Sequence, residues 1–255
     1  MEMQYFKQYS PDLGRDMECK VYGHKGRPVI FIPCQDGRCY DFENFHMTDA
    51  MAPWIDSGQI MVCSIDTIDQ ETWSDRFHAP RWRIERYEQW ITYITNQVVP
   101  FIQNMASEKN DGQKYPGVLV CGCSLGATHA TNLFLRRPDL FDRLMALSGI
   151  YTAEYGFDNY MDDLVYQNSP IHYMANMPLD HPYIPLLNEK KGVICVGQGP
   201  WEIPDSTRTL ARILEEKKIH IWVDFWGFDC AHDWDWWYKQ TAYFMPYLLA
   251  PETES

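Results

Sequence analysis

Short runs of apolar residues alternate along this chain with longer segments in which apolar residues recur every three or four positions. Runs of the first kind, typical of strands buried on both faces, lie at residues 29–32, 60–65, 118–121, 144–149 and 193–196, and strands are also expected at 17–22 and 220–226. Helical spacing is found at 84–105 and 127–135, from about 206 to 217, and in a terminal helix that ends near 249. This alternation predicts a mostly parallel sheet of about seven strands with helices on both faces.

The strand expected at 118–121 runs into the sequence Gly-Cys-Ser-Leu-Gly at residues 122–126 and from there directly into a helix. A Gly-x-Ser-x-Gly turn between a strand and a helix forces the central serine into a strained backbone conformation, and it needs residues without bulk on either side. Such a turn exposes the serine at the end of the sheet, which makes Ser124 the candidate nucleophile. The alternative is a tight strand-to-helix turn with an ordinary serine that faces solvent.

A second loop, at residues 33–38, follows the strand at 29–32 and therefore lies at the carboxyl edge of the predicted sheet, where open α/β sheets place ligand sites. In hydrolases with such a serine, this loop donates one backbone N–H to the oxyanion hole, and the residue after the nucleophile donates the other. The candidates are Gln35, followed by Cys34, in the loop, and Leu125 after the serine. A plain connection is the alternative interpretation of the loop.

A nucleophilic serine needs a base that takes its proton and a third group that orients the base. The chain order in such hydrolases is serine, acid, histidine, and His232 lies in the loop after the last expected strand, ahead of tryptophans at 234, 236 and 237 that can shield it from water. The loop after 193–196 offers Glu202 and Asp205. Asp205 directly precedes the expected helix and is interpreted as its N-cap, with its side chain occupied by backbone N–H groups. Glu202 is therefore the preferred acid and Asp205 the alternative.

Different roles are expected for the remaining histidines. His129 falls within the helix after the serine and is interpreted as a histidine with satisfied hydrogen bonds and not as the base. Three others, His24, His46 and His78, precede Ser124, so their use as the base would break the chain order. Surface or supporting roles are expected for them. No metal is expected, because the acids at 233 and 235 lie too close in sequence to His232 for a dedicated ligand set and no His-Glu-x-x-His occurs.

Two polar segments are candidates for the walls of a pocket. The loop after 60–65 is dense in polar and aromatic side chains, including Asp69, Trp73 and Arg76, and is interpreted either as a pocket wall or as a structural loop. From about 150 to 191 the chain loses its periodicity and is rich in Tyr, Asn, Asp, Met and Pro. A segment of this length without periodicity in a compact domain is usually functional, so we expect a cap or lid with an aromatic lining.

Length, charge and composition narrow the interpretation further. The 255 residues contain no repeat or Gly/Ser linker, which favours a single domain over 1–255. A formal net charge of −13 argues against nucleic acid and anionic membranes as partners, since both require clustered Lys and Arg. The N-terminus shows no leader pattern and no run is long enough for a membrane span, so a cytoplasmic protein is expected. The eight cysteines are scattered, and most are expected to be buried thiols.

A resemblance to a known family rests on stretches that extend over nearly the whole chain: residues 21–24 before Pro28, 37–38 with 42–43, 64–66 with 71–73, 122–126, and 227–237. Together they resemble the putative esterase group of the α/β-hydrolase superfamily, bacterial proteins related to esterase D, feruloyl esterase and the mycolyltransferase antigens. The resemblance implies an α/β-hydrolase fold with Ser124 as nucleophile and His232 as base. The acid region departs from the usual pattern, in which a strand ends in Gly-x-x-Asp, because residues 197–200 are Gly-Gln-Gly-Pro.

The sequence thus predicts a serine hydrolase that cleaves carboxylic esters through an acyl-enzyme, with Glu202 orienting His232. No cofactor is needed, the expected partner is a small-molecule ester, and self-association into a homo-oligomer is left open. Two alternatives keep the same fold. One is an acyltransferase that passes the acyl group to an alcohol or sugar, and the other is a non-catalytic binding protein.

Overall fold

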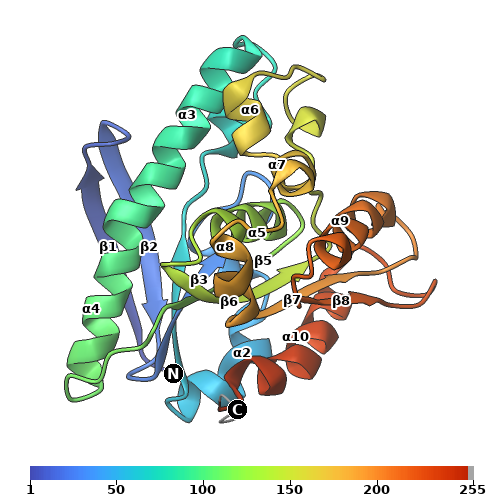
Figure 1. Ribbon diagram of the computed structural model, residues 1–255. Coiled ribbons are helices and arrows are strands. Elements are labelled where there is room, and N and C mark those ends of the chain that lie inside the picture. The colour runs from blue at the N-terminus through green and yellow to red at the C-terminus, as the bar shows by residue number, and fades with distance from the viewer. Residues whose placement is uncertain (252–255) are drawn as a thin grey trace.

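The computed structural model describes residues 1–251, which are built around one eight-stranded sheet with the strand order β1-β2-β4-β3-β5-β6-β7-β8 (Figure 1). The strands are β1 (Met3–Ser10), β2 (Arg15–Tyr22), β3 (Arg27–Ile32), β4 (Ile60–Ile65), β5 (Val118–Cys123), β6 (Phe141–Leu147), β7 (Lys191–Val196) and β8 (Trp222–Phe225). Strands β4, β3, β5, β6, β7 and β8 run parallel to one another, whereas β1 with β2 and β2 with β4 pair antiparallel. The prediction of a mostly parallel sheet is confirmed.

Strand β1 is one more than the sequence pattern predicts. It forms a hairpin with β2 and lies at the edge of the sheet. Tyr5 and Tyr9 are largely exposed, while Phe6 packs edge-on against Phe101 at 5.0 Å between ring centroids. Because most of this edge strand faces solvent, it lacks the continuous apolar run by which the buried strands can be found in the sequence.

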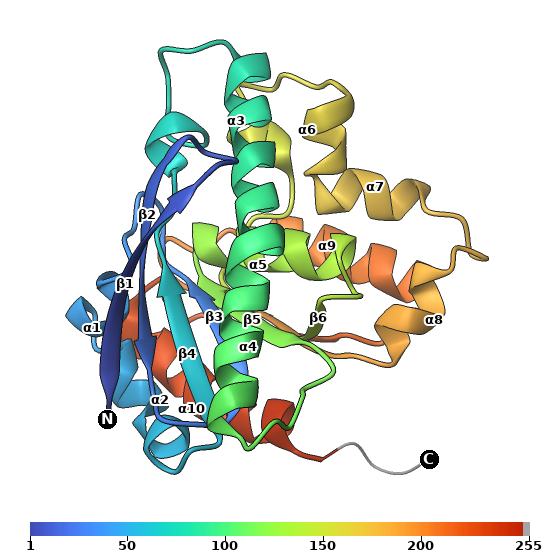
Figure 2. The same ribbon diagram turned by 90° about the vertical axis from the view of Figure 1, so that its left-hand side faces the viewer.

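Helices cover both faces of the sheet, as predicted (Figure 2). One face carries α2 (Met47–Asp56), α10 (Trp234–Leu249) and the short α1 (Asp41–Asn44). The other face carries α3 (Pro80–Tyr93), α4 (Val99–Lys109), α5 (Leu125–Arg136) and α9 (Pro204–Glu216). A π-helical turn at Ile94–Val98 joins α3 to α4, and Pro100 is tolerated at this junction because it occupies the first turn of α4.

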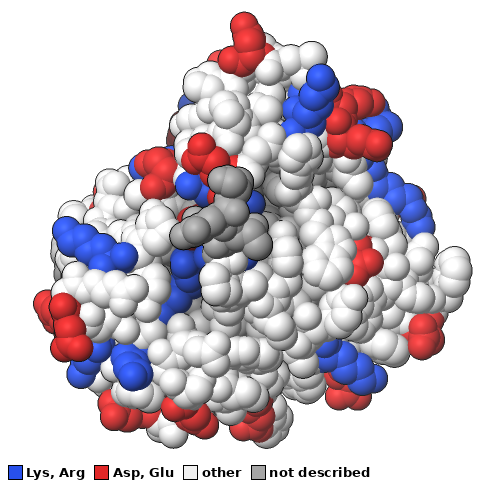
Figure 3. All heavy atoms as spheres, turned by 60° about the horizontal axis from the view of Figure 1, so that its bottom comes forward, with Lys and Arg blue, Asp and Glu red and all other residues white. Residues whose placement is uncertain are grey.

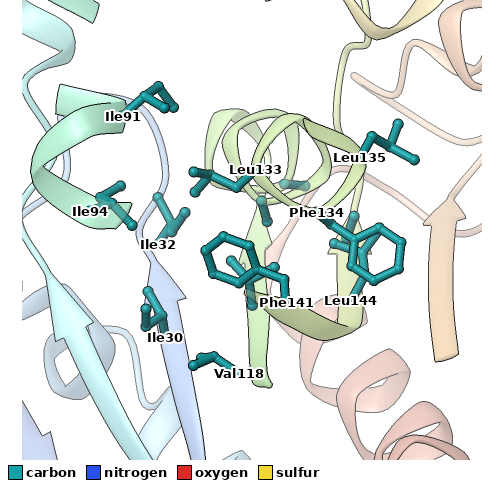
Figure 4. Packing of buried hydrophobic residues seen from close by; sticks show 14 of the residues in the cluster. Ile30, Ile32, Ile91, Ile94, Val118, Leu133, Phe134, Leu135, Phe141 and Leu144 are labelled. Atoms are coloured by element: carbon teal, nitrogen blue, oxygen red, sulfur yellow. The ribbon is translucent and has the colours of Figure 1, made fainter. Parts of the chain in front are cut away.

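Alternate side chains of the central strands pack on opposite faces of the sheet. In β3, Ile30 and Ile32 belong to the core under α3, α4 and α5, whereas Val29 and Phe31 belong to the core over α2 and α10. Figure 4 shows the first of these cores, where side chains of β3, α3, α5 and β6 meet. Because successive side chains of a strand point to opposite faces, a strand covered on both must be apolar throughout. This explains the uninterrupted apolar runs in the sequence.

The segment at 150–191 forms a 3-10 turn at Ala153–Tyr155 and the short helices α6 (Asp163–Gln167), α7 (Pro170–Asn176) and α8 (Tyr183–Asn188). These helices lie beside α3, α5 and α9 (Figures 1 and 2). Tyr151, Phe157 and Met174 are fully buried in the core of that face. The segment is therefore held in place by packed side chains.

The surface charges, the helices and the cysteines can each be compared with the expectations from the sequence. On the face shown in Figure 3, Lys and Arg side chains are interspersed with Asp and Glu, without a broad patch of one sign among the described residues there. No helix in residues 1–251 is long and apolar enough to cross a membrane. All eight cysteines are free thiols, and seven of them are buried, which confirms the expectation for most of them.

The parallel strands bring six loops to one edge of the sheet. Since β3 to β8 all run in the same direction, the loops that follow their carboxyl ends meet there. They carry residues 33–38 after β3, 66–76 after β4, Ser124 after β5, Ser148 after β6, Glu202 after β7 and His232 after β8. The topology thus gathers side chains that are far apart in sequence; Ser124 and His232, for example, are separated by 108 residues.

Candidate active site

Ser124 lies at the junction of β5 and α5 with φ 55° and ψ −127°, the strained conformation expected for this turn. The two glycines that flank it allow close packing. A Cβ on Gly126 would come within 2.2 Å of the carbonyl oxygen of Ile32, and one on Gly122 within 2.5 Å of the backbone of Gly126. The sequence therefore folds into this turn because α5 can approach β3 only where side chains are absent.

A line of hydrogen bonds connects three of the predicted side chains. Ser124 Oγ lies 2.9 Å from His232 Nε2, and His232 Nδ1 lies 3.2 Å from Glu202 Oε2. The His232 side chain is 26% exposed, whereas that of Glu202 is 1% exposed. In the tautomer with the proton on Nδ1, the imidazole donates to the carboxylate and offers Nε2 as an acceptor to the serine hydroxyl.

Glu202 is held by groups from two other loops. Its Oε1 accepts hydrogen bonds from Ser148 Oγ at 2.6 Å and from the backbone N–H of Gly197 at 3.1 Å. Ser148 in turn accepts from Trp237 Nε1 at 2.9 Å. A buried carboxylate requires such donors, since an unpaired charge away from water is strongly destabilised.

Ser148 is a residue that the sequence reasoning missed. It follows β6 as Ser124 follows β5, its backbone N–H bonds to Cys195 of β7, and it also has a positive φ, of 61°. Since Cys123 pairs with Leu147 in the sheet, the two serines occupy equivalent positions on neighbouring strands. The sequence signal for it is weak: a serine near the end of the strand expected at 144–149, without distinctive neighbours.

Asp205, the alternative acid, is placed away from His232. The interpretation of Asp205 as the N-cap of α9 is wrong: the helix begins at Pro204 with Ile203 in the cap position and no side-chain cap. Asp205 lies in the first turn, is 90% exposed, and pairs with Arg208 at 2.8 Å. Because Pro204 already has the fixed φ and the missing N–H that suit the first helical position, the helix starts one or two residues earlier than its apolar spacing suggests.

The loop that carries His232 is fixed by its backbone and by one of the three tryptophans. The N–H of His232 donates to the carbonyl of Pro200 at 3.0 Å, which ties the histidine loop to the acid loop. Trp237 packs edge-on against the imidazole, with 5.0 Å between ring centroids. Trp234 stacks on Phe45, and Trp236 contacts Trp226, so the expected shielding of the ring comes from Trp237.

Gln35 and Leu125 line the same cavity as Ser124 and His232. Neither backbone N–H has an acceptor within residues 1–251; Leu125 is the first residue of α5, where an N–H has no partner in the helix. Cys34 does not line the cavity. Burial, with the nearby Asp41 and Asp69, raises the pKa of its thiol to about 12, so it is protonated at neutral pH and unsuited as a competing nucleophile.

A buried histidine links the helix after Ser124 to the loops around it. His129 is fully buried, with Nδ1 2.8 Å from Tyr87 Oη and Nε2 3.1 Å from Asp69 Oδ1. The other oxygen of Asp69 accepts the backbone N–H of Asp36 at 3.0 Å. The interpretation of His129 as a histidine with satisfied hydrogen bonds is confirmed, and its partner Asp69 holds the loop that contains Gln35.

The other predicted histidines lie outside the cavity. His46 contacts Asp49 and His78 contacts Asp75 at 2.6 Å, and neither residue, nor His24, lines the space beside Ser124. Among residues 1–251, no group of three His, Cys, Asp or Glu side chains is placed to hold a metal ion.

The cavity next to Ser124 measures about 340 Å³. Its wall includes Trp73 and Arg76 from the loop after β4, which settles the interpretation of that loop in favour of a pocket wall. Ile150, Tyr155 and Gly156 come from the 150–191 segment, which therefore borders the site. The remaining lining residues are Gln35, Ser124, Leu125, Thr128, Ser148, Gly149, Trp201, Ile203 and His232.

Comparisons with known proteins agree with this architecture. Residues 10–243 match the model of a family described as putative esterase. None of the curated proteins compared with the chain matches it. Similar solved structures include a ferulic acid esterase, with 18% identity over 97% of this chain and 98% of the other and a TM-score of 0.72. An S-formylglutathione hydrolase from Agrobacterium tumefaciens has 13% identity over 95% and 91% of the two chains and a TM-score of 0.67.

A third similar structure is MPT51 (FbpC1) of Mycobacterium tuberculosis, with 14% identity over 98% of each chain and a TM-score of 0.66. At such low identities these likenesses establish the fold, which is that of the α/β-hydrolases. The predicted fold class and the predicted family resemblance are both confirmed.

Proposed function

The chain belongs to the putative esterase family, and on that premise we propose that it is a serine hydrolase that cleaves carboxylic esters through an acyl-enzyme. The observation that supports this most directly is the line of hydrogen bonds from Ser124 through His232 to Glu202 beside a cavity. A strained serine that contacts a histidine, which a buried carboxylate orients, is the arrangement that activates a hydroxyl as a nucleophile.

The proposed first step is acylation. Ser124 Oγ attacks the ester carbonyl carbon while its proton moves to His232 Nε2, and the carbonyl oxygen becomes an oxyanion. The backbone N–H groups of Leu125 and Gln35 are proposed to stabilise this oxyanion. Loss of one such donor typically lowers kcat by about 10²-fold to 10³-fold. Collapse of the intermediate breaks the bond to the alcohol oxygen, which takes the proton from His232.

The second step returns the enzyme to its starting state. Water attacks the acyl carbon and gives its proton to His232, and the new tetrahedral intermediate expels Ser124 Oγ, which recovers the proton. Glu202 stabilises the imidazolium that forms in both steps. Each proton moves between Ser124, His232 and the reacting groups, so the reaction needs no cofactor.

A mass measurement after treatment with a fluorophosphonate tests this proposal, because such a reagent labels an activated serine. We expect one adduct on the natural protein and none on Ser124→Ala or His232→Ala. Ser57→Ala is a matched control, since its hydroxyl is on an exposed turn and bonds only locally, to Pro53, Trp54 and Gln59, and it should be labelled like the natural protein. A natural protein that is folded but unlabelled would favour a non-catalytic binding protein, and labelling of Ser124→Ala would place the reactive serine elsewhere.

A further inference from the structure

The cavity next to Ser124 contains one permanently charged side chain. Of its lining residues, Arg76 carries a guanidinium, and none of the described residues in the lining is an aspartate or glutamate. The acid of the hydrogen-bonded line, Glu202, lies behind His232 and is almost completely buried. The lining residues of the cavity thus carry a positive formal charge, in a chain whose formal net charge is −13. A cleft of one sign within low-dielectric walls attracts ligand groups of the other sign.

Arg76 shares its carboxylate partner with a second arginine. Its Nη1 donates to the carbonyl of Gly156 at 3.3 Å and to Asp158 Oδ1 at 3.1 Å, and its side chain is 55% exposed. Asp158 is shared with a second guanidinium, because its Oδ2 lies 2.5 Å from Nη2 of the fully buried Arg83. One carboxylate therefore faces two guanidinium groups. Asp75, the residue before Arg76, adds a second carboxylate to this loop, and its oxygens contact the His78 ring and the backbone N–H groups of Phe77 and His78.

Trp73 forms the wall beside Arg76. Its side chain lines the cavity, whereas its indole N–H is buried and has no acceptor among the described residues. Gly156 fixes the ring and the guanidinium relative to each other: its carbonyl accepts from Arg76, and a Cβ on it would come within 2.2 Å of the Trp73 ring. The guanidinium is therefore held beside an aromatic ring in the cavity wall.

From these contacts we propose that the ester substrate carries a carboxylate group that Arg76 binds. The proposal rests on the esterase function proposed above and names the substrate class of that site. A carboxylate only accepts hydrogen bonds, and it matches the planar fork of a guanidinium, which only donates them. Tyr155 and Trp201, which also line the cavity, are available for an apolar or aromatic part of the same substrate.

Matched pairs of esters test this proposal. One pair places the charge in the acyl part: mono-4-nitrophenyl glutarate against 4-nitrophenyl pentanoate, which differ by a carboxylate in place of a methyl group. The other places it in the alcohol part: 4-acetoxybenzoate against 4-methylphenyl acetate. For each pair, kcat/KM is measured after subtraction of the uncatalysed rate. For each protein, kcat/KM for the anionic ester is divided by kcat/KM for its neutral partner. The ratio for the natural protein is then divided by the ratio for Arg76→Gln, which cancels differences in the intrinsic reactivity of the esters.

We expect this quotient to be about tenfold for at least one pair, the range typical of a charge-assisted hydrogen bond that is partly exposed to water. The pair that responds identifies the end of the ester that carries the charge. Arg81→Gln is the matched control, because Arg81 is about equally exposed and pairs with Glu85 and Asp162 outside the cavity; its quotient should stay near one. A quotient within twofold of one for both pairs with Arg76→Gln would overturn the proposal.

A salt titration of the natural protein gives an independent test that needs no variant. Raising the ionic strength screens the attraction between Arg76 and an anion, so kcat/KM for the responding anionic ester should fall while that for its neutral partner stays level. Equal salt dependence for both members of each pair would contradict the proposal. Failure here is distinct from failure of the esterase function, because in the latter case no ester, neutral or anionic, would be cleaved in a manner that depends on Ser124.

Discussion

Glu202→Gln would keep the shape of the buried acid and remove its charge. The side chain has no room to reorganise freely, because one of its oxygens faces His232 and the other accepts from both Ser148 and Gly197. A glutamine amide offers one oxygen and one NH₂ group to these two sides. If the NH₂ group faces His232 Nδ1, the imidazole must carry its proton on Nε2 and cannot accept the proton of Ser124.

In the other orientation, the amide oxygen faces His232 and the NH₂ group meets the N–H of Gly197, which is a clash of two donors at 3.1 Å. Both orientations therefore carry a penalty, and neither stabilises an imidazolium as a carboxylate does. Replacing the acid of a serine–histidine–acid triad by its amide lowers kcat by about 10⁴-fold. We expect a loss of about 10³-fold to 10⁴-fold here, which corresponds to about 4–5.5 kcal/mol in the barrier.

The assay is the hydrolysis of 4-nitrophenyl acetate, with kcat and KM measured separately and thermal unfolding followed on the same samples. Asp205→Asn is the matched control: it makes the same change at the alternative acid, which is exposed and paired with Arg208, and it should keep nearly full activity. Retention of more than a tenth of kcat by Glu202→Gln would refute the reasoning. So would an equal loss in Asp205→Asn, because the acid would then act from a position that the observed contacts do not support.

Two further substitutions separate the support of the acid from the support of the turn. Ser148→Ala removes a hydrogen bond to the Glu202 carboxylate, and a bond to a charged group is worth about 1.5–3 kcal/mol. We therefore expect kcat to fall about tenfold to a hundredfold with little change in KM. An unchanged kcat would show that Ser148 does not position Glu202. Gly126→Ala places a methyl group 2.2 Å from the Ile32 carbonyl oxygen and should lower the free energy of unfolding, measured in urea, by about 3 kcal/mol or more. The control is Gly112→Ala, where nothing lies within 4 Å and only φ is unfavourable, and it should lower this free energy by about 1 kcal/mol. Equal losses in the two variants would contradict the packing argument.

The parts of the fold that could be predicted are those buried on both faces. A strand such as β3 is apolar at every position because each face meets a helix layer, and this pattern is visible in the sequence. The hairpin strand β1 could not be found in this way, since it lies at the edge and exposes Tyr5 and Tyr9. Its strand conformation depends on pairing with β2, a contact that the pattern of hydrophobicity does not encode.

The same distinction applies to the site. Chain order places Ser124 and His232 at one edge of a parallel sheet, so their contact could be predicted from the topology alone. Glu202 was preferred for a reason that proved wrong, because Asp205 does not cap α9; what separates the two acids is that residues 197–201 turn back toward the end of β8. Ser148 was missed because a single hydroxyl after a strand has no distinctive neighbours in sequence. Its contact with Glu202 follows from tertiary packing.

The burial of Glu202 also explains why this arrangement would favour a reacting state over a resting one. Three donors surround the carboxylate, the hydroxyl of Ser148, the N–H of Gly197 and the ring of His232, which offsets the loss of water around a charge. With a neutral imidazole, the carboxylate gains only a hydrogen bond from the ring. In the proposed reaction the proton of Ser124 moves to His232, and the same contact becomes an ion pair shielded from water, where charges interact more strongly than in solution. The carboxylate thus stabilises the charged imidazole more than the neutral one, which is the condition for lowering a barrier.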